Sequence, residues 1–189
     1  GPGDLRIRVD EDIELRLQSV DDAGEYFALI DGDRERLRTF MEWVDGLVRI
    51  EDEQAFLSAR EEEHVLGRGL SFGIWHLGRI VGAVGTVTLD RLNEVAEVGY
   101  FVVGEHEGRG LMFRAVGAFC DHLFAEEGMN RLSARIMTSN HRSRALIERL
   151  GFTLEGVHRQ EYKLRGEHHD MAVYSLLRSE WDARRGRRA

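Results

Sequence analysis

The middle of the chain alternates strand-type and helix-type patterns in an order that restricts its fold. Residues 70–77 and 80–89 are β-type runs separated by Gly78 and Arg79, and a two-residue turn with glycine first is typical of a tight hairpin. A third strand is predicted over residues 95–103. The hairpin predicts an antiparallel pair of strands in this part of the fold.

The segments that follow have the opposite character, because a short strand is flanked by two helices. A helix is predicted over residues 111–127, a strand over 132–137, a second helix over 141–150 and a final strand over 171–177. Strands joined through a helix usually lie parallel, whereas hairpin strands lie antiparallel. The sequence therefore predicts an α/β fold with a central mixed β-sheet flanked by helices.

The N-terminal third begins with a strand and continues with three helices. Apolar residues alternate over 13–17, which predicts a strand. Ser19, with Asp22 three residues later, has the pattern of a helix cap, and a helix follows it. Two further helices are predicted over 33–43 and 51–66.

Size and composition predict one domain over residues 1–189, with flexible tails at 1–10 and 184–189. The chain has no internal repeat and no Pro/Ser-rich linker, and its single Cys cannot form an internal disulfide. No paired Cys/His spacing predicts a zinc site, so we expect no metal and a reducing, cytoplasmic setting. The uncharged stretch 80–89 is half the length of a membrane span. A net charge of −8 argues against broad nucleic-acid binding.

Two glycine-containing segments are the strongest indications of a binding site. Residues 97–112 form a strand, a turn with Gly108 and Gly110, and the start of a helix, which is an arrangement that favours a phosphate. The nucleoside-triphosphate motif GxxxxGK[ST] is absent, and Phe113 stands where a dinucleotide motif needs glycine. The second segment runs from Asn140, a possible helix cap, to the glycine and phenylalanine that end this helix.

Together the two segments resemble the GCN5-related N-acetyltransferase (GNAT) superfamily, and specifically its branch of ribosomal-protein N-terminal acetyltransferases. The acyl-CoA loop of the family falls on Glu107-Gly-Arg-Gly-Leu-Met112, where Glu107 replaces the usual Gln or Arg and Met112 the usual small residue. Similarity extends to Met41-Glu-Trp-Val-Asp45, Phe152-Thr-Leu-Glu-Gly156 and the last strand, and so covers nearly the whole chain.

The resemblance implies an acetyl-CoA-dependent N-acetyltransferase in which the acceptor amine attacks the thioester directly, without an acyl-enzyme. In the family, one strand backbone binds the pantetheine arm and the oxyanion, and a helix N-terminus binds the pyrophosphate. The residues that this implies for acetyl-CoA are Phe101, Val102, Val103, Gly108, Arg109, Gly110, Leu111, Met112, Phe113 and Asn140.

The resemblance also suggests the catalytic groups. Many members use a tyrosine as the acid for the leaving thiolate, but Ile147 stands at that position here, and Ser143 matches the serine of the ribosomal branch. The alternative for Ser143 is a helix-terminal serine that satisfies the backbone. For the base, Glu97 and Glu161 both remain open, as does water. Glu161 would face the wrong side of a regular strand, unless a bulge corrects its direction.

The acceptor site is implied by the same resemblance to include Arg38, Trp43, His169 and Asp170. A metal at the adjacent histidines 168–169 is not expected, because neighbouring strand residues point to opposite faces. The favoured acceptor is a protein N-terminal α-amine of the ribosomal-protein type. A small-molecule amine such as a polyamine, amino acid or antibiotic, or an acyl-CoA-binding module without catalysis, are the alternatives. The resemblance suggests a homodimer, and neither membrane nor nucleic acid is an expected partner.

Overall fold

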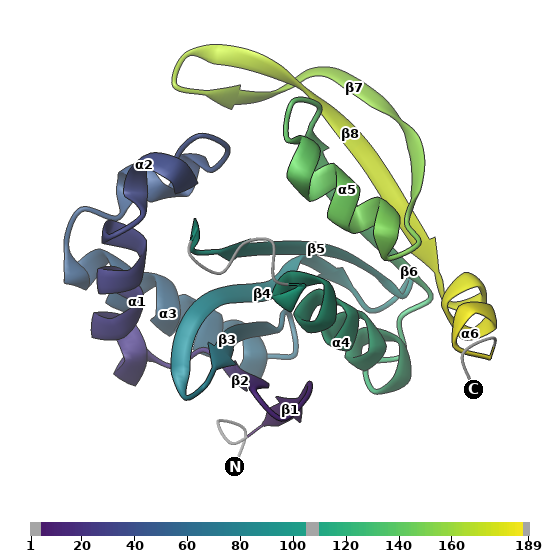
Figure 1. Cartoon of the computed structure of the whole chain (residues 1–189), viewed down its shortest axis with the longest axis horizontal. Helices are drawn as coiled ribbons and strands as arrows, with labels where there is room; N and C mark the ends of the chain where they lie inside the picture. Colours follow the sequence, from purple (N-terminus) through teal and green to yellow (C-terminus); the bar gives the residue numbers. More distant parts are fainter. Residues whose placement is uncertain (1–4, 105–109, 187–189) are drawn as a thin grey trace. The chain divides into compact units, whose positions relative to one another are not determined.

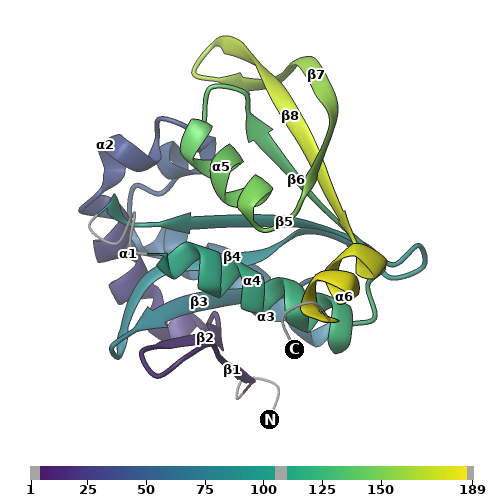
Figure 2. The same ribbon diagram turned by 45° about the vertical axis from the view of Figure 1, so that its right-hand side comes forward.

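The computed structural model describes residues 5–104 and 110–186. Within these residues, eight strands form one mixed sheet in the order β1-β2-β3-β4-β5-β6-β8-β7, and helices flank it (Figures 1 and 2). The predicted α/β fold with a mixed central sheet is therefore confirmed. No helix of the described part is long and apolar enough to cross a membrane.

The strands are β1 (Arg6–Arg8), β2 (Ile13–Leu17), β3 (Ser71–His76), β4 (Arg79–Asp90), β5 (Val95–Val102), β6 (Arg131–Met137), β7 (Thr153–Leu164) and β8 (Glu167–Leu177). The helices are α1 (Ala23–Asp31), α2 (Arg34–Leu37), α3 (Ile50–Val65), α4 (Leu111–Ala125), α5 (His141–Arg149) and α6 (Arg178–Gly186), with 3₁₀ turns η2 (Val20–Asp22) and η3 (Glu42–Gly46). Strand β1 lies within the expected N-terminal tail, and α6 extends into the expected C-terminal one.

The chain divides into two compact units. The first comprises Gly1–Thr86 with Gly99–Ala118, and the second comprises Val87–Val98 with Phe119–Ala189. Strands β4 and β5 and helix α4 each contribute residues to both units, so neither unit is a continuous piece of chain. The single domain over residues 1–189 stays a prediction.

The first unit is an antiparallel meander covered by helices. Strand β2 pairs antiparallel with β1 and with β3, and Leu15 stands opposite Ile74. Alternate residues of β2 are buried, as the sequence pattern predicts. Two apolar clusters pack here, one around Tyr26 and Leu57 and the other around Leu37, Val44 and their neighbours.

One predicted helix of this unit is wrong in its extent. The pattern over 33–43 predicts a continuous helix, but α2 ends at Leu37 and the chain then turns back into η3. The guanidinium of Arg34 donates to the carbonyl of Val44 at 2.7 Å and to that of Leu47 at 2.6 Å. These contacts hold the following segment against α2, so tertiary hydrogen bonds override the helical pattern.

The second unit is built on β6, β8 and β7, and α5 lies beside these strands (Figures 1 and 2). Strand β5 joins it through parallel pairs from Val95↔Arg131 to Glu97↔Ser133. The hairpin of β7 and β8 extends beyond the strand predicted over 171–177. The sequence pattern did not predict β7, because this strand is mostly exposed and shows little apolar alternation. Helix α6 is held through Trp181, whose Nε1 donates to Asp121 at 2.6 Å.

Glu53 of α3 is a carboxylic acid buried in the first unit. It is 1% exposed, and within residues 5–104 and 110–186 its Oε2 has no hydrogen-bond partner. Burial raises its pKa from 4.5 to about 7. Between these two values the folded state holds a proton that the unfolded state has released, so stability falls as the pH rises through this window.

We therefore expect Glu53→Gln to raise the free energy of unfolding at pH 8 by about 2–3 kcal/mol, and by much less at pH 5. Urea unfolding at both pH values measures this difference. Glu62→Gln, on the exposed side of the same helix, is the matched control and should change little at either pH. A stabilisation by Glu53→Gln that does not depend on pH would contradict this assignment.

Candidate active site

The end of β5, expected to bind the pantetheine arm, lies in the first unit and packs closely on β4. The N–H of Val103 donates to the carbonyl of Val81 at 3.0 Å, and the carbonyl of Val102 accepts from the guanidinium of Arg36. A Cβ at Gly82 would lie 2.2 Å from the carbonyl oxygen of Phe101, so only glycine fits at this crossing. The backbone of this segment is thus tightly positioned.

Gly110 leads into α4 in a left-handed conformation, with φ of +71°. This conformation favours glycine. The carbonyl of Gly110 accepts the N–H of Arg114 at 3.2 Å, which closes the first turn of the helix, and also the Nε of Arg114 at 3.3 Å. The first amides of an α-helix have no acceptor within the helix, and the macrodipole there favours an anion. Gly108 and Arg109 lie outside the described residues.

Trp43, one of the residues expected in the acceptor site, contacts the same strand end. The ring of Trp43, in η3, packs on Phe101 with centroids 5.3 Å apart and an interplanar angle of 54°. Arg38 is ion-paired, since its Nε lies 2.8 Å from Oδ1 of Asp45. The structure thus brings Trp43 and Phe101 together within the first unit, while Arg38 braces the 3₁₀ turn.

The two candidate bases share one arginine in the second unit. Oε1 of Glu97, on β5, lies 3.3 Å from Nε of Arg135 on β6. The other side of the same guanidinium is paired with Glu161 of β7, which also contacts His158. Glu97 and Glu161 are therefore linked through Arg135.

A bulge in β7 gives Glu161 this direction. His158 pairs with Met171 and Tyr162 with His169, so three residues of β7 stand opposite the single residue Asp170. Gln160, inside the bulge, has φ of +52° and donates its N–H to Oδ1 of Asp170 at 2.8 Å. The bulge that Glu161 requires is present, and Asp170 stabilises it; His169 lies at its edge.

The two carboxylates differ in their tendency to hold a proton. Burial raises the pKa of Glu97 above that of an ordinary glutamate, and Arg135 offsets this in part. Hydrogen bonds from His158 and Arg135 lower the pKa of Glu161. A general base works best with a pKa close to the working pH, so the environment favours Glu97 for this role.

The N-terminus of α5 carries Asn140 and Ser143. Asn140 is the N-cap, and its Oδ1 accepts the N–H of Ser143 at 3.3 Å. Ser143 is half-buried in the first turn, and Ile147 one turn later is fully buried. The capping role of Asn140 is confirmed, whereas its role toward pantetheine and that of Ser143 toward the thiolate stay predictions.

Several arginines that organise these segments had no distinguishing signal in the sequence. Arg144 fixes α5, because its Nε donates to the buried hydroxyl of Tyr174 at 2.9 Å and its Nη1 to the carbonyl of Thr138 at 3.1 Å. Arg36 likewise binds the backbone at the end of β5, and Arg135 links Glu97 with Glu161. Almost every basic residue of the chain is arginine, so the residue type alone does not distinguish these positions.

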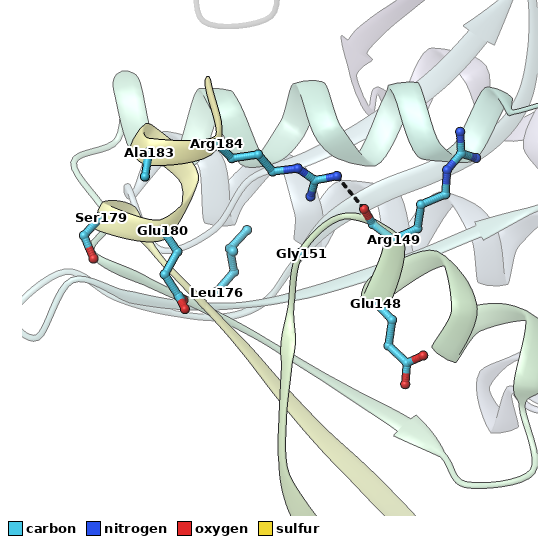
Figure 3. A pocket seen from close by; sticks show the side chains of 8 residues that line it. All are labelled: Glu148, Arg149, Gly151, Leu176, Ser179, Glu180, Ala183 and Arg184. Carbon is cyan, nitrogen blue, oxygen red and sulfur yellow. Dashed lines mark hydrogen bonds between the residues drawn. The ribbon is translucent and has the colours of Figure 1, made fainter. Parts of the chain in front are cut away.

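A cavity of about 760 Å³ lies in the second unit, at the C-terminal end of α5 (Figure 3). It is lined by Glu148, Arg149, Gly151, Leu176, Ser179, Glu180, Ala183 and Arg184. Nη2 of Arg184 donates to the carbonyl of Arg149 at 2.7 Å and so caps the helix (Figure 3). None of the expected site residues lines this cavity. Within the described chain, no three His, Cys, Asp or Glu side chains are grouped as a metal site would require.

Known proteins resemble the chain over most of its length. Residues 12–153 match the family model of the acetyltransferase (GNAT) domain. YdaF of Bacillus subtilis (strain 168), a proposed ribosomal N-acetyltransferase, is 30% identical over 93% of this chain and 96% of its own. The ribosomal-protein-serine acetyltransferase of Escherichia coli (strain K12) is 24% identical over 90% of this chain and 96% of its own.

A solved structure is also similar. The microcin C7 self-immunity acetyltransferase MccE, in complex with acetyl-CoA and AMP, superposes with a TM-score of 0.87 at 25% identity, over 94% of this chain and 97% of that one. The mixed α/β fold, the glycine at the start of α4 and these similarities all indicate the same family. The chain belongs to the GNAT family of acetyltransferases.

Proposed function

We propose that the chain transfers the acetyl group of acetyl-CoA to the α-amine at the N-terminus of a protein, with a ribosomal protein as the type of acceptor. The observation that carries this proposal is the similarity, over nine-tenths of the chain, to two proteins whose names assign N-acetylation to the ribosome or its proteins. Family membership supports acetyl-CoA as the donor.

The donor half of the site is assigned to the first unit. The N-terminus of α4 after Gly110 suits the pyrophosphate, since the amides at a helix N-terminus and the helix dipole both favour an anion. The backbone at the end of β5 suits the pantetheine arm and the oxyanion. We assign the oxyanion donor to a backbone N–H of this segment.

The reaction needs a proton acceptor for the amine and a proton donor for the thiolate. The neutral amine attacks the thioester carbon, a C–N bond forms, and the carbonyl oxygen takes up negative charge. Glu97 removes the amine proton, directly or through water. The C–S bond then breaks, and the CoA thiolate leaves with a hydrogen bond from the Ser143 hydroxyl and takes its proton from water. Glu161 stays ionised and keeps Arg135 in place beside Glu97.

The acceptor wall is assigned to Trp43, on Phe101, together with Arg38, His169 and Asp170. The chemistry favours an α-amine over a lysine side chain. An α-amine with a pKa of about 7.7–8.0 is roughly 10% neutral at pH 7, whereas a lysine amine near 10.4 is neutral in about one molecule in 2,500. A single glutamate as base is better matched to the first of these.

Ser143→Ala is expected to lower kcat by roughly 10- to 100-fold with little change in KM for acetyl-CoA, as for the loss of one neutral donor. Steady-state kinetics with a fixed acceptor measures both constants. Ser139→Ala, at an exposed serine just before the cap, is the control and should behave as the wild type. A Ser143→Ala enzyme with unchanged kcat would leave this serine with a role at the helix terminus alone.

The experiment that tests the function is thiol release from acetyl-CoA, with and without a panel of acceptors. Release stimulated by peptides with a free N-terminal serine or alanine supports the proposal. Release stimulated only by polyamines, amino acids or antibiotics would replace it with small-molecule acetylation. Binding of acetyl-CoA without release for any acceptor would indicate a non-catalytic module.

A cytoplasmic location and a homodimer are also part of this proposal. Ribosomal proteins are made in the cytoplasm, so an enzyme that acetylates them would act there. Light scattering during size-exclusion chromatography would give the oligomeric state.

A further inference from the structure

Helix α2 is a single turn, yet it is the centre of a set of contacts between segments far apart in the sequence. Arg34 donates to the carbonyls of Val44 and Leu47, in and just after the 3₁₀ turn that carries Trp43. Arg38, directly after α2, pairs with Asp45 of the same turn. These two arginines hold the turn that we assign to the acceptor wall.

Arg36 and Asp33 point instead to the end of β5. Nη2 of Arg36 donates to the carbonyl of Val102, and its Nε donates to Oδ2 of Asp33 at 2.7 Å. The same Oδ2 accepts the N–H of Gly104 at 2.8 Å. One ion pair therefore binds a carbonyl and an amide two residues apart in the backbone.

The fit between this ion pair and the strand end is close. A Cβ at Gly104 would lie 2.8 Å from Nε of Arg36 and 3.6 Å from Oδ1 of Asp33. The side chains of Arg36 and Asp33 are 36% and 23% exposed, so the pair is partly shielded from water. A guanidinium forms several hydrogen bonds in a fixed planar geometry, which suits it to hold a backbone in one place.

We propose that Asp33 and Arg36 are positioning residues for acetyl-CoA. Through them and through Arg34, α2 fixes the end of β5 and the turn that carries Trp43 relative to each other. This inference rests on the proposed function, which assigns pantetheine to Phe101–Val103 and the acceptor to the Trp43 turn. Asp33 and Arg36 act through the backbone of β5 and do not themselves contact the substrate. Misplacement of reacting groups by about 1 Å can cost about 100-fold in rate, so a fixed backbone here matters.

The inference predicts that the neighbouring arginines affect different substrates. Arg36→Met is expected to raise the Kd for acetyl-CoA about 10-fold or more, because one charged hydrogen bond and its partner carboxylate are disturbed. The KM for the acceptor peptide should change by less than about 3-fold, on the same scale of free energy. Arg34→Met should have the reverse effect, with the larger change in acceptor KM.

Calorimetry with acetyl-CoA and steady-state kinetics with a serine-terminated peptide measure these constants, and thermal melts report stability. Arg91→Met is the matched control, because Arg91 forms a similar pair with Glu127, at 3.2 Å, far from α2 in the sequence. It should leave both constants unchanged. Arg36→Lys is the conservative variant, and it should stay impaired because an ammonium lacks the planar fork.

Unchanged acetyl-CoA affinity in a folded Arg36→Met or Arg36→Lys protein would overturn the inference. So would equal changes in both constants for the Arg34 and Arg36 variants, since that result indicates a general structural effect. If the wild type binds acetyl-CoA but acetylates no peptide, the proposed function fails while the comparison of Kd values still decides the role of Arg36. If the wild type does not bind acetyl-CoA, both fail.

Discussion

Replacement of Glu97 by glutamine is expected to lower kcat by about 10²- to 10⁴-fold, the range typical of a lost general base. Glu161→Gln is the matched control, because Glu161 binds the same Arg135 and carries the same change in charge. We expect it to cost less than about 10-fold, since its pKa is lowered and it is a weak base. Steady-state kinetics of the two variants with one peptide gives the comparison.

The pH dependence gives this prediction a second, independent measurement. The base acts when deprotonated, so kcat/KM should fall on the acid side as Glu97 takes up a proton, and burial moves this limb above the ordinary pKa of glutamate. Arg135 lowers the pKa of Glu97, so Arg135→Met should move the acid limb to higher pH. Glu161 raises it, so Glu161→Gln should move the limb to lower pH.

A Glu97→Gln enzyme that keeps its kcat and its acid limb would show that the base is another group. A large loss of kcat in Glu161→Gln with little loss in Glu97→Gln would assign the role of general base to Glu161, in the bulge of β7.

Gly110→Glu is expected to weaken acetyl-CoA binding by about 100-fold or more, because a carboxylate would face the pyrophosphate at the start of α4. Gly110→Ala is the matched control. Both variants place a side chain at φ of +71°, which costs roughly 1–2 kcal/mol in either protein. The difference between their Kd values, measured by calorimetry, therefore reports the charge rather than the backbone strain.

Salt provides a further check on this pair. The ratio of the Kd values of the Gly110→Glu and Gly110→Ala variants for acetyl-CoA should fall as ionic strength rises, because exposed charges are screened over about 10 Å at 0.1 M. Equal affinity of two folded variants would show that the N-terminus of α4 is not the pyrophosphate site.

Much of the fold could be predicted from local patterns. The apolar alternation of 13–17, the hairpin at Gly78 and the strand–helix order from 95 to 150 all appear in the structure within a few residues. Ser19 does cap the first turn, since its Oγ accepts the N–H of Asp21 at 3.2 Å. These features depend on residues close in sequence, so a single sequence contains the information.

The parts that the pattern missed depend on contacts between distant residues. The helix predicted over 33–43 ends early because Arg34 binds carbonyls ten and thirteen residues away. The bond from Arg36 to Val102 spans 66 residues. Its acceptor is a main-chain carbonyl, which every residue has. No sequence pattern marks such an acceptor, so the role of α2 becomes visible only in three dimensions.

The candidate site, too, could be predicted only in part, because some of its features depend on contacts between distant residues. The need for a bulge near Glu161 followed from the two-residue period of strands, and the bulge is present between His158 and Tyr162. That Glu161 and Glu97 share Arg135 could not be predicted, because it depends on the register of four strands, β5, β6, β8 and β7. Trp43 was expected near the acceptor, and its packing on Phe101 adds a direct link to the donor strand.

The most direct test of the proposed function is mass spectrometry of a peptide with a free N-terminal serine or alanine and one internal lysine, after incubation with acetyl-CoA and the protein. The same peptide with a blocked N-terminus is the control. We predict a single acetyl group on the N-terminal residue of the free peptide and none on the blocked one. Acetyl groups found mainly on the lysine, or on small amines and on neither peptide, would contradict the proposal.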